Sequence, residues 1–478
     1  MALNDPRQAQ AFRFVRANYA DGVAELVYAF DDGPELVERI TFPHAPALPP
    51  ERAEAFAAAL KWLHLAAGVS YYKAGVPARI EVDDGAPDAA TAELLDTLYL
   101  HGLAEFAYRN KLDLRERIRF PRIELLQGGM SPGTVRPRIK AGAGSERSEA
   151  ESKDPKSPAS RLDLPQRTLI PIGGGKDSLV VIEAIKRSGG TGTVAWVGHS
   201  PLIAACAERT GLPTLNIGRE LSPILFDYNR MGAWNGHIPV TAVNSAILVL
   251  AALLYGHDTI AFANERSASA ATLEYEGQEV NHQWSKGLAF ERAFADWLHT
   301  HVATDLDYCS LLRPFSELAV TAAFARLGND YGDVFSSCNR NFRILGPKPA
   351  DRWCGQCPKC HFVFLALAPF MPKPKLLAIF GRNLLDDEDQ AAGFDALMEY
   401  HDHKPFECVG EGSEARAAMA TLAARPEWAE DALVKRFRRE ILPQLNVAEL
   451  ALEPWLAPSA EHYVAPRLQK ALDEIRHA

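Results

Sequence analysis

Hydrophobic and polar residues in the first part of the chain alternate with the periods of short helices and strands. Apolar residues recur at helical spacing over residues 51–68 and 89–110, and short apolar runs typical of strands lie at residues 22–30 and 78–82. These patterns predict an α+β N-terminal domain over residues 1–138.

A polar stretch then interrupts the pattern. Residues 141–160 contain no large apolar side chain and are rich in Ser, Glu, Lys and Ala. A stretch with so little apolar surface to bury cannot offset the entropy that it would lose on ordering. We therefore expect a flexible linker over residues 139–163.

Beyond the linker, strands and helices alternate along the chain. Strands are predicted at residues 168–172, 193–197, 214–217 and 259–263, and helices at residues 178–186, 202–210 and from Val240 onward. Strand followed by helix, repeated at these spacings, predicts a parallel sheet with helices on both faces. We assign this α/β domain to residues 164–365 and expect its ligands at the carboxyl ends of the strands. Residues 366–478 are predicted to form a helical C-terminal region in which Trp428, Phe437 and Trp455 are packing anchors.

Composition and charge narrow the class of protein. The chain has 478 residues and is 47% hydrophobic, which is enough for two or three domains with their own cores. Its most apolar stretch, Val243 to Tyr255, is too short to cross a bilayer, and its N-terminus lacks the basic start and apolar run of a signal peptide. A net charge of -10 argues against bulk nucleic acid as the main partner. We expect a cytoplasmic protein without a membrane or nucleic-acid partner.

A glycine-rich turn follows the first strand of the α/β domain. It reads PIGGGKDS and contains Gly173, Gly174 and Gly175. Consecutive glycines let the backbone approach an anion closely, and the helix that begins near Lys176 adds the positive end of its dipole. A plain glycine-rich connector is the alternative, but the position after the first strand favours a polyphosphate site.

The side chains of this turn suit a nucleotide. Lys176 can neutralise phosphate charge, Ser178 can donate a hydrogen bond to a phosphate, and Asp177 can hold Mg²⁺. A Walker A loop is excluded, because Asp177 stands where that motif has Ser or Thr. GGGKDS resembles the SGGxDS motif of the PP-loop ATP pyrophosphatases, with Gly173 in place of the first Ser. The resemblance implies a PP-loop (Rossmann-like) fold that binds the pyrophosphate portion of ATP, with Val197 and Gly198 beside the adenine.

Four of the seven cysteines are clustered. They are Cys338, Cys354, Cys357 and Cys360, the last three in a C-x₂-C-x₂-C run. Four thiolates at this spacing can surround Zn²⁺ tetrahedrally, and an iron–sulfur cluster is the closest alternative. The spacing resembles the zinc site of PP-loop enzymes that make queuosine precursors. That resemblance implies a closed, structural metal site with four cysteine ligands.

Further segments resemble one family over nearly the whole chain. They are GVSYYK, GLAEFAYRN, ANERSAS and VNHQWSK, taken together with the glycine turn and the cysteines. These segments resemble the MurL family, the epimerases that act on UDP-N-acetylmuramoyl-L-alanyl-L-glutamate. The resemblance implies that the terminal L-glutamate of this UDP-linked muramoyl dipeptide is converted to D-glutamate through an acyl-adenylate, with release of AMP and pyrophosphate. ATP, Mg²⁺ and a structural Zn²⁺ are the implied cofactors.

This chemistry is consistent with the use of ATP. Removal of the Cα proton from a carboxylate would give a highly unstable dianion, whereas the Cα–H of an acyl-adenylate is far more acidic. A peptide-linked glutamate has no free amine for a pyridoxal Schiff base. Activation through the carboxyl group is therefore a reasonable substitute for that cofactor.

Epimerisation also needs groups that remove and return the Cα proton. His282, Lys286 and Glu265 are candidates for these groups, and Lys176 and Asp177 of the glycine turn are expected to be catalytic through their contacts with ATP and Mg²⁺. Each of the first three is more often a helix cap, a surface group or a substrate contact. The remaining cysteines, Cys206, Cys309 and Cys408, are predicted to be small buried hydrophobes rather than a racemase-type thiol pair.

Two alternatives to the epimerase stay open at this point. One is another PP-loop adenylating enzyme, either similar to the deazapurine nitrile synthases or a tRNA sulfur transferase. The other is a non-catalytic nucleotide-binding protein in which ATP only orders a partner surface. Binding of tRNA would favour a sulfur transferase, although the acidic net charge of the chain argues against it.

Overall fold

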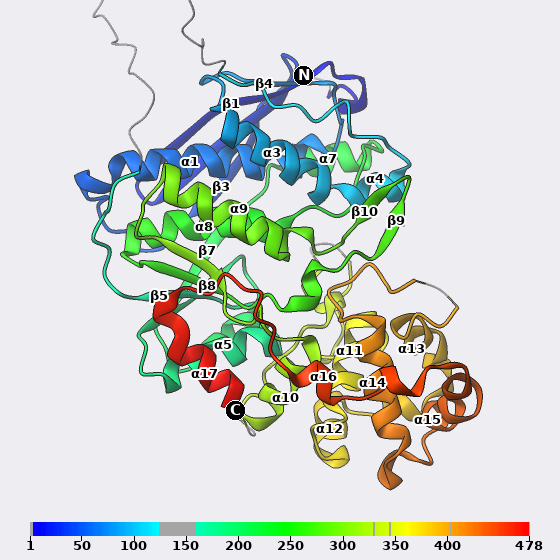
Figure 1. Cartoon of the computed structure of the whole chain (residues 1–478). Coiled ribbons are helices and arrows are strands. Elements are labelled where there is room, and N and C mark those ends of the chain that lie inside the picture. The colour runs from blue at the N-terminus through cyan, green and yellow to red at the C-terminus, as the bar shows by residue number, and fades with distance from the viewer. Residues whose placement is uncertain (1–2, 124–158, 328–329, 344–345, 402, 478) are drawn as a thin grey trace, which may run out of the picture.

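A single sheet of nine strands organises the chain (Figure 1). The computed structural model describes residues 3–123, 159–327, 330–343, 346–401 and 403–477. Within them the strand order is β11-β8-β5-β6-β7-β3-β2-β1-β4. The strands of this sheet are β1 (Ala11–Ala20), β2 (Val23–Phe30), β3 (Leu36–Thr41), β4 (Arg79–Val82), β5 (Thr168–Pro171), β6 (Gly192–Val197), β7 (Thr214–Glu220), β8 (Thr259–Phe262) and β11 (Asp307–Ser310). A separate hairpin is made of β9 (Leu273–Tyr275) and β10 (Gln278–Val280).

One half of the sheet is parallel, as predicted. Strands β11, β8, β5, β6 and β7 pair in parallel, and four of them lie at the predicted positions. Successive residues of β5 point to opposite faces, so that Leu169 belongs to one hydrophobic core and Ile170 to the other. The helices of the first core include α1 (Ala53–Ala67), α3 (Ala89–Gly102), α8 (Val240–Tyr255) and α9 (Leu288–His301). Those of the second include α5 (Lys176–Arg187), α6 (Pro201–Arg209), α10 (Glu317–Arg326) and α11 (Pro358–Leu367).

The N-terminal strands extend the same sheet. β3 pairs antiparallel with β7, with Ile40 opposite Arg219, and the first core contains residues from α1 and from α8. The remaining helices of this part are α2 (Val69–Tyr72) and α4 (Ala104–Asn110), and α7 (Pro223–Arg230), from later in the chain, packs against β3. The two parts of the chain therefore share one sheet and one core. The domain limits stay a prediction, and most of the predicted linker lies outside the described residues.

The C-terminal region is helical, as predicted. Its helices are α12 (Lys373–Phe380), α13 (Ala391–Leu397), α14 (Gly412–Ala423), α15 (Ala432–Arg436), α16 (Glu453–Leu456) and α17 (Gln469–His477). Trp428 and Phe437 are fully buried, while Trp455 is only partly buried. The last helix returns to the sheet, where α17 lies beside α5 (Figure 1).

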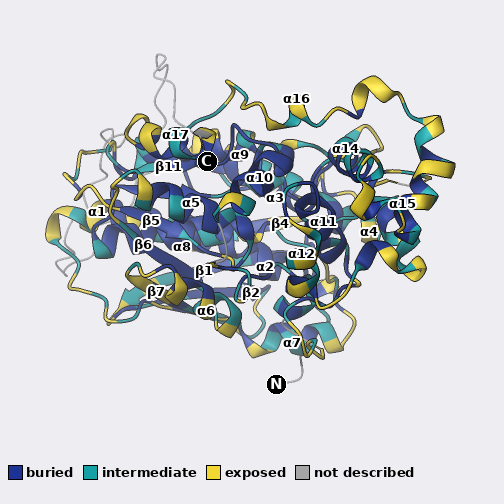
Figure 2. Cartoon of the chain, turned by 90° about the horizontal axis from the view of Figure 1, so that it is seen from below, coloured by how far each residue is buried: buried dark blue, intermediate teal, exposed yellow. Residues whose placement is uncertain are grey.

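Burial follows the layers of the fold. Strands β2, β5, β6, β8 and β11 and the central helices α8 and α11 are buried along most of their length, and exposed residues gather on peripheral elements such as α16 (Figure 2). Helix α8 is the predicted apolar helix and lies in the first core. Among the described residues, no helix is both long and apolar enough to cross a membrane.

Candidate active site

The glycine turn joins β5 to α5 at the carboxyl edge of the parallel strands. Gly174 has a φ of +80°, a conformation that residues with a side chain rarely adopt. Gly175 is the N-cap of α5, and no side chain caps the helix there. A Cβ atom added to Gly173 would meet no atom within 4 Å. The turn thus combines open space with a helix N-terminus whose first N–H groups lack a side-chain partner.

The segment before the first clustered cysteine covers this turn. The backbone N–H of Ser336 donates to the carbonyl oxygen of Gly174 over 2.8 Å. The Cys206 thiol donates to the same oxygen over 3.6 Å. A Cβ on Gly175 would lie 3.2 Å from the Cβ of Ser337. No sequence pattern indicates these contacts, because they join residues far apart in the chain.

Lys176 is buried in an ion-pair network. Its ammonium group bonds to Asp177 over 2.5 Å and also to Glu317, the first residue of α10. Burial lowers the pKa of Lys176, but the two carboxylates outweigh it and raise the pKa above its ordinary value. Ser178 Oγ donates to the carbonyl oxygen of Gly175 over 3.1 Å. In this structure Lys176 and Ser178 brace the turn itself, and their phosphate contacts stay a prediction.

The predicted adenine contacts lie on the neighbouring strand. Val197 ends β6, which pairs with β5 in parallel. Gly198 follows with a φ of +95°, and its N–H donates to the carbonyl oxygen of Ile217 over 2.8 Å. A Cβ on Gly198 would meet no atom within 4 Å. The position is therefore open at the edge of the sheet where the glycine turn also lies.

The three predicted proton carriers belong to one polar region. Glu265 follows β8 and is buried, and no hydrogen-bond partner for its Oε1 lies among the described residues. Burial, together with Glu317 and Asp177, raises the pKa of Glu265 to about 7. Lys286 donates to the Sγ of Cys408 over 3.1 Å, and the Nδ1 of His282 lies 2.5 Å from the Oε2 of Glu105.

The prediction that Cys408 is a small buried hydrophobe is wrong, because its side chain is only partly buried and accepts a hydrogen bond from Lys286. Burial raises the pKa of its thiol, but Lys286, His282 and Lys359 outweigh burial and bring the pKa down to about 5. Burial instead raises the pKa of Cys206 and of Cys309 to about 12. Cys408 is therefore a thiolate at neutral pH, while the other two cysteines are neutral. We call Cys408, Lys286, His282 and Glu105 the thiolate cluster.

The four clustered cysteines meet, as predicted. Their sulfurs lie 3.4 Å apart for Cys357 and Cys360, 3.7 Å for Cys354 and Cys360, and 4.0 Å for Cys338 and Cys357. Tetrahedral Zn–S bonds of about 2.3 Å place neighbouring sulfurs about 3.8 Å apart. Gly355, at a φ of +62°, makes the reversal between the first two cysteines of the run. The donor set and its spacing fit a single structural metal ion.

A second group of metal-ligating residues is better described as an ion-pair network. Glu105, His237 and His282 bring ligand atoms within 4.8 Å of one another. Burial lowers the pKa of His282, but hydrogen bonds to Cys408 and Glu105 raise it to about 9, so its ring is cationic at neutral pH. Arg109 pairs with the other oxygen of Glu105 over 2.6 Å. Both oxygens of Glu105 thus have cationic partners in this structure.

Comparison with known proteins places the chain in a family. The MurL N-terminal domain matches residues 3–311, and the MurL C-terminal domain matches residues 334–451. The chain belongs to the MurL family. A UDP-N-acetyl-alpha-D-muramoyl-L-alanyl-L-glutamate epimerase from Xanthomonas oryzae pv. oryzae is 58% identical over 98% of this chain and 98% of its own. Epimerases with the same name from Micromonospora sp. and Salinispora tropica are 39% and 37% identical over 98% of this chain. These matches cover 98% of the Micromonospora protein and 97% of the Salinispora protein.

These findings confirm that the chain is an isomerase of the epimerase type. The two MurL domains also divide the site between them. Glu105, His282 and Lys286 lie in the segment matched by the N-terminal domain, whereas Cys408 and the four clustered cysteines lie in the segment matched by the C-terminal domain. The thiolate cluster therefore joins both domains of the MurL family.

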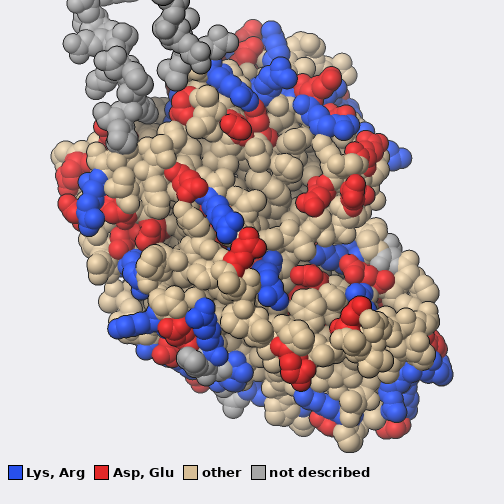
Figure 3. Space-filling model, viewed as in Figure 1, with Lys and Arg blue, Asp and Glu red and all other residues tan. Residues whose placement is uncertain are grey.

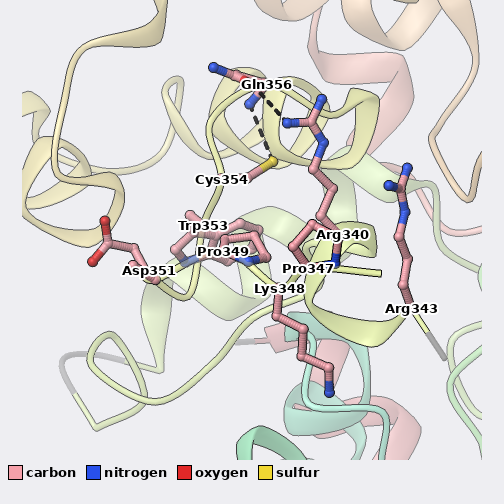
Figure 4. A pocket seen from close by; sticks show the side chains of 10 residues that line it. Arg340, Arg343, Pro347, Lys348, Pro349, Asp351, Trp353, Cys354 and Gln356 are labelled. Carbon is pink, nitrogen blue, oxygen red and sulfur yellow. Dashed lines mark hydrogen bonds between the residues drawn. The ribbon is translucent and has the colours of Figure 1, made fainter. Parts of the chain in front are cut away.

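A hollow of about 410 Å³ lies beside the cysteine site (Figure 4). Arg340, Arg343 and Lys348 line it, with one carboxylate, that of Asp351. Arg340 donates to the side-chain oxygen of Gln356 over 2.7 Å, as Figure 4 shows. The hollow is suited to an anionic group, but none of the predicted catalytic residues lines it.

Proposed function

We propose that the chain is an ATP-dependent epimerase that converts the terminal L-glutamate of UDP-N-acetylmuramoyl-L-alanyl-L-glutamate to D-glutamate, a step of peptidoglycan precursor synthesis. The observation that carries the proposal is the match to relatives that bear this substrate in their names, over almost the full length of each chain. The reaction proceeds through an acyl-adenylate and releases AMP and pyrophosphate.

The glycine turn supports ATP as the activating substrate. It lies between a parallel strand and a helix N-terminus, where oligophosphates bind in sheets of this kind. Gly173 leaves room for the phosphates, Gly174 and Gly175 shape the turn beside it, and Asp177 is the proposed Mg²⁺ ligand. The open position at Gly198 suits the adenine. These features make up the proposed PP-loop fold.

Activation explains how a glutamate residue can be inverted without an amine-linked cofactor. The carboxylate form of the substrate resists loss of its Cα proton, because the product would carry two negative charges. The adenylate removes one of those charges and makes the Cα–H more acidic. Cations beside the site, such as the partly buried Lys286 and the buried Lys359, would stabilise the remaining negative charge.

We propose Zn²⁺ as the ion of the cysteine site. The short distances between the sulfurs favour one ion, because an iron–sulfur cluster would hold its four ligands farther apart. All four ligand positions are occupied by cysteine, so the site would be structural. A cytoplasmic location is part of the proposal, because ATP is found there and free thiolates need a reducing compartment.

Charges on the viewed surface are mixed. Figure 3 shows Lys and Arg side chains interspersed with Asp and Glu, without a continuous basic area on that face. A small anionic substrate bound in a local site is compatible with this distribution.

The complete reaction tests the proposal. The full chain is incubated with ATP, Mg²⁺ and UDP-N-acetylmuramoyl-L-alanyl-L-glutamate, and the terminal glutamate is released and analysed for chirality. We expect D-glutamate together with AMP and pyrophosphate. UDP-N-acetylmuramoyl-L-alanine, which lacks the reacting residue, is the matched control and should give no AMP. Absence of both AMP and D-glutamate from the complete reaction would overturn the proposal.

A further inference from the structure

We infer that Cys408 is the base that removes the Cα proton of the activated glutamate, held as a thiolate between Lys286 and the His282–Glu105 pair. This inference rests on the proposed function and names one catalytic residue for it.

Two cationic groups of one segment, residues 282–286, act on the sulfur. Lys286, at the end of a short 3₁₀ helix, donates to Sγ over 3.1 Å. His282 is a second cation that lowers the pKa of the thiol. Neither cation is a sequence neighbour of Cys408, so the fold has brought them to it. A thiolate is the form of cysteine that such partners stabilise.

Glu105 positions the imidazole. Its Oε2 lies 2.5 Å from His282 Nδ1, while its Oε1 accepts a hydrogen bond from Arg109 Nε. Glu105 is only 5% exposed, so its charge acts on His282 with little screening by water. The order Glu105, His282, Cys408 resembles the arrangement in which a carboxylate orients an imidazole that in turn activates a nucleophile or base.

Cations dominate the charged groups around the sulfur. Lys286, His282 and Lys359 lower the pKa of Cys408, and burial opposes them. Glu407 precedes Cys408, and burial raises its own pKa to about 6. The cations outweigh the carboxylates at the sulfur. Cys408 is thus ionised at the pH where the enzyme would work.

The thiolate cluster is connected to the glycine turn by one hydrogen bond and two ion pairs. Lys359 bonds to the carbonyl oxygen of Cys408, and its Nζ lies 3.6 Å from an oxygen of Glu317. Glu317 in turn pairs with Lys176, the first residue of α5. A substrate with its activated carboxyl group at the turn would therefore have Cys408 within the same polar region.

Proton removal by Cys408 converts the acyl-adenylate to an enolate. The Cα–H bond of the acyl-adenylate breaks, an S–H bond forms at Cys408, and the electron pair moves into the enolate of the acyl group. Lys286 and His282 keep their protons and remain cationic. Delivery of a proton to the opposite face of Cα then completes the inversion. The inference concerns only the removal on one face.

The test separates activation from proton transfer. Cys408→Ser and Cys408→Ala are compared with wild type and with Cys309→Ala, a neutral buried cysteine outside the thiolate cluster. Substrate-dependent exchange of labelled pyrophosphate into ATP reports adenylation. Deuterium incorporation at Cα in D₂O and the chirality of glutamate report proton transfer. We expect exchange within about threefold of wild type, and deuterium incorporation lower by roughly 100-fold or more.

Several results would overturn the inference. They are inversion at a near wild-type rate in a folded Cys408 variant, loss of pyrophosphate exchange in that variant, or an acyl adduct on Cys408 in the quenched wild-type reaction. The adduct would make Cys408 a nucleophile instead of a base. If wild type itself shows neither exchange nor inversion, the proposed function has failed instead.

A second measurement does not depend on folding of the variants. Wild-type protein is treated with iodoacetamide at pH 6.5, and alkylation of each cysteine is followed by peptide mass spectrometry. We expect Cys408 to react faster than Cys206 and Cys309, and the dipeptide substrate with ATP to slow its reaction. Alkylation of Cys408 no faster than that of the two neutral cysteines would contradict its thiolate form.

Discussion

The backbone N–H of Ser336 donates to the carbonyl oxygen of Gly174, which fastens the segment leading into the cysteine site to the glycine turn. The cysteine site begins two residues later, at Cys338. The metal site and the proposed nucleotide site are therefore mechanically linked, although the metal would take no part in the reaction.

Loss of the metal should weaken nucleotide binding. Cys357→Ser removes one of the four thiolates and loosens the segment that carries Ser336. We expect a lower melting temperature and an affinity for ATP reduced roughly tenfold, equivalent to the ~1.4 kcal/mol that one hydrogen bond to the turn can contribute. Calorimetric titration with ATP measures the change in affinity. Cys309→Ala is the control, and equal ATP affinity in metal-free and metal-loaded protein would refute the link.

Substitutions of two glycines in the turn should affect protein stability differently, although both should weaken ATP binding. Gly174→Ala places a side chain at a φ of +80°, so we expect a loss of about 1–2 kcal/mol of unfolding free energy along with weaker ATP binding. Gly173→Ala meets no protein atom, so its stability should stay at the wild-type level while ATP binding weakens. Denaturant unfolding and ATP titration of both variants check this. Unchanged ATP affinity in Gly173→Ala would mean that no phosphate lies against this glycine.

The pH midpoint for alkylation of Cys408 should rise when Lys286 is replaced by a neutral residue. The wild-type thiol, with a pKa of about 5, is ionised above that pH, so its alkylation rate rises as pH increases through about 5. Lys286→Met removes a cation that favours the thiolate, and the midpoint should therefore shift upward. The shift is measured from alkylation rates between about pH 4 and about pH 9. This range includes the ordinary pKa of a thiol, about 8.5. Lys470→Met, an exposed substitution on α17, should leave the midpoint unchanged.

Lys176 should contribute to the stability of the fold as well as to phosphate binding. It is 1% exposed and pairs with Asp177 and Glu317, so Lys176→Met leaves the partly exposed Asp177 without this cation and the buried Glu317 with only Lys359, 3.6 Å away. We expect a loss of about 3–5 kcal/mol of unfolding free energy. The double variant with Glu317→Gln should recover part of it. Additive losses in the double variant, measured by urea unfolding, would show that the two side chains do not interact.

The parallel half of the fold could be predicted because its signals are local. Residues 168–172 and 193–197 are short apolar runs followed by helices, and these runs became β5 and β6. The pairing of β3 with β7 could not be predicted, because no feature of residues 36–41 indicates which distant strand completes their hydrogen bonds. That pairing joins the N-terminal part to the rest of the sheet.

The same reasoning applies to the site. Four thiols at metal-binding spacing are recognisable in the sequence, and the structure brings them together. Cys408 is preceded by Phe406 and Glu407, and nothing in this context distinguishes it from an inert cysteine. Its ionisation arises from Lys286 and His282, which are more than a hundred positions away and reach it only after folding.

Strand β3 has a protective role that follows from its place in the sheet. Without it, β7 would be the border of the parallel half, with a row of backbone amides and carbonyls ready to recruit a strand from another molecule. A truncated protein that lacks residues 1–41 would therefore tend to aggregate during expression. This would hold even if every residue of the nucleotide and cysteine sites were retained. Solubility of the enzyme thus depends on a segment that contributes no side chain to its chemistry.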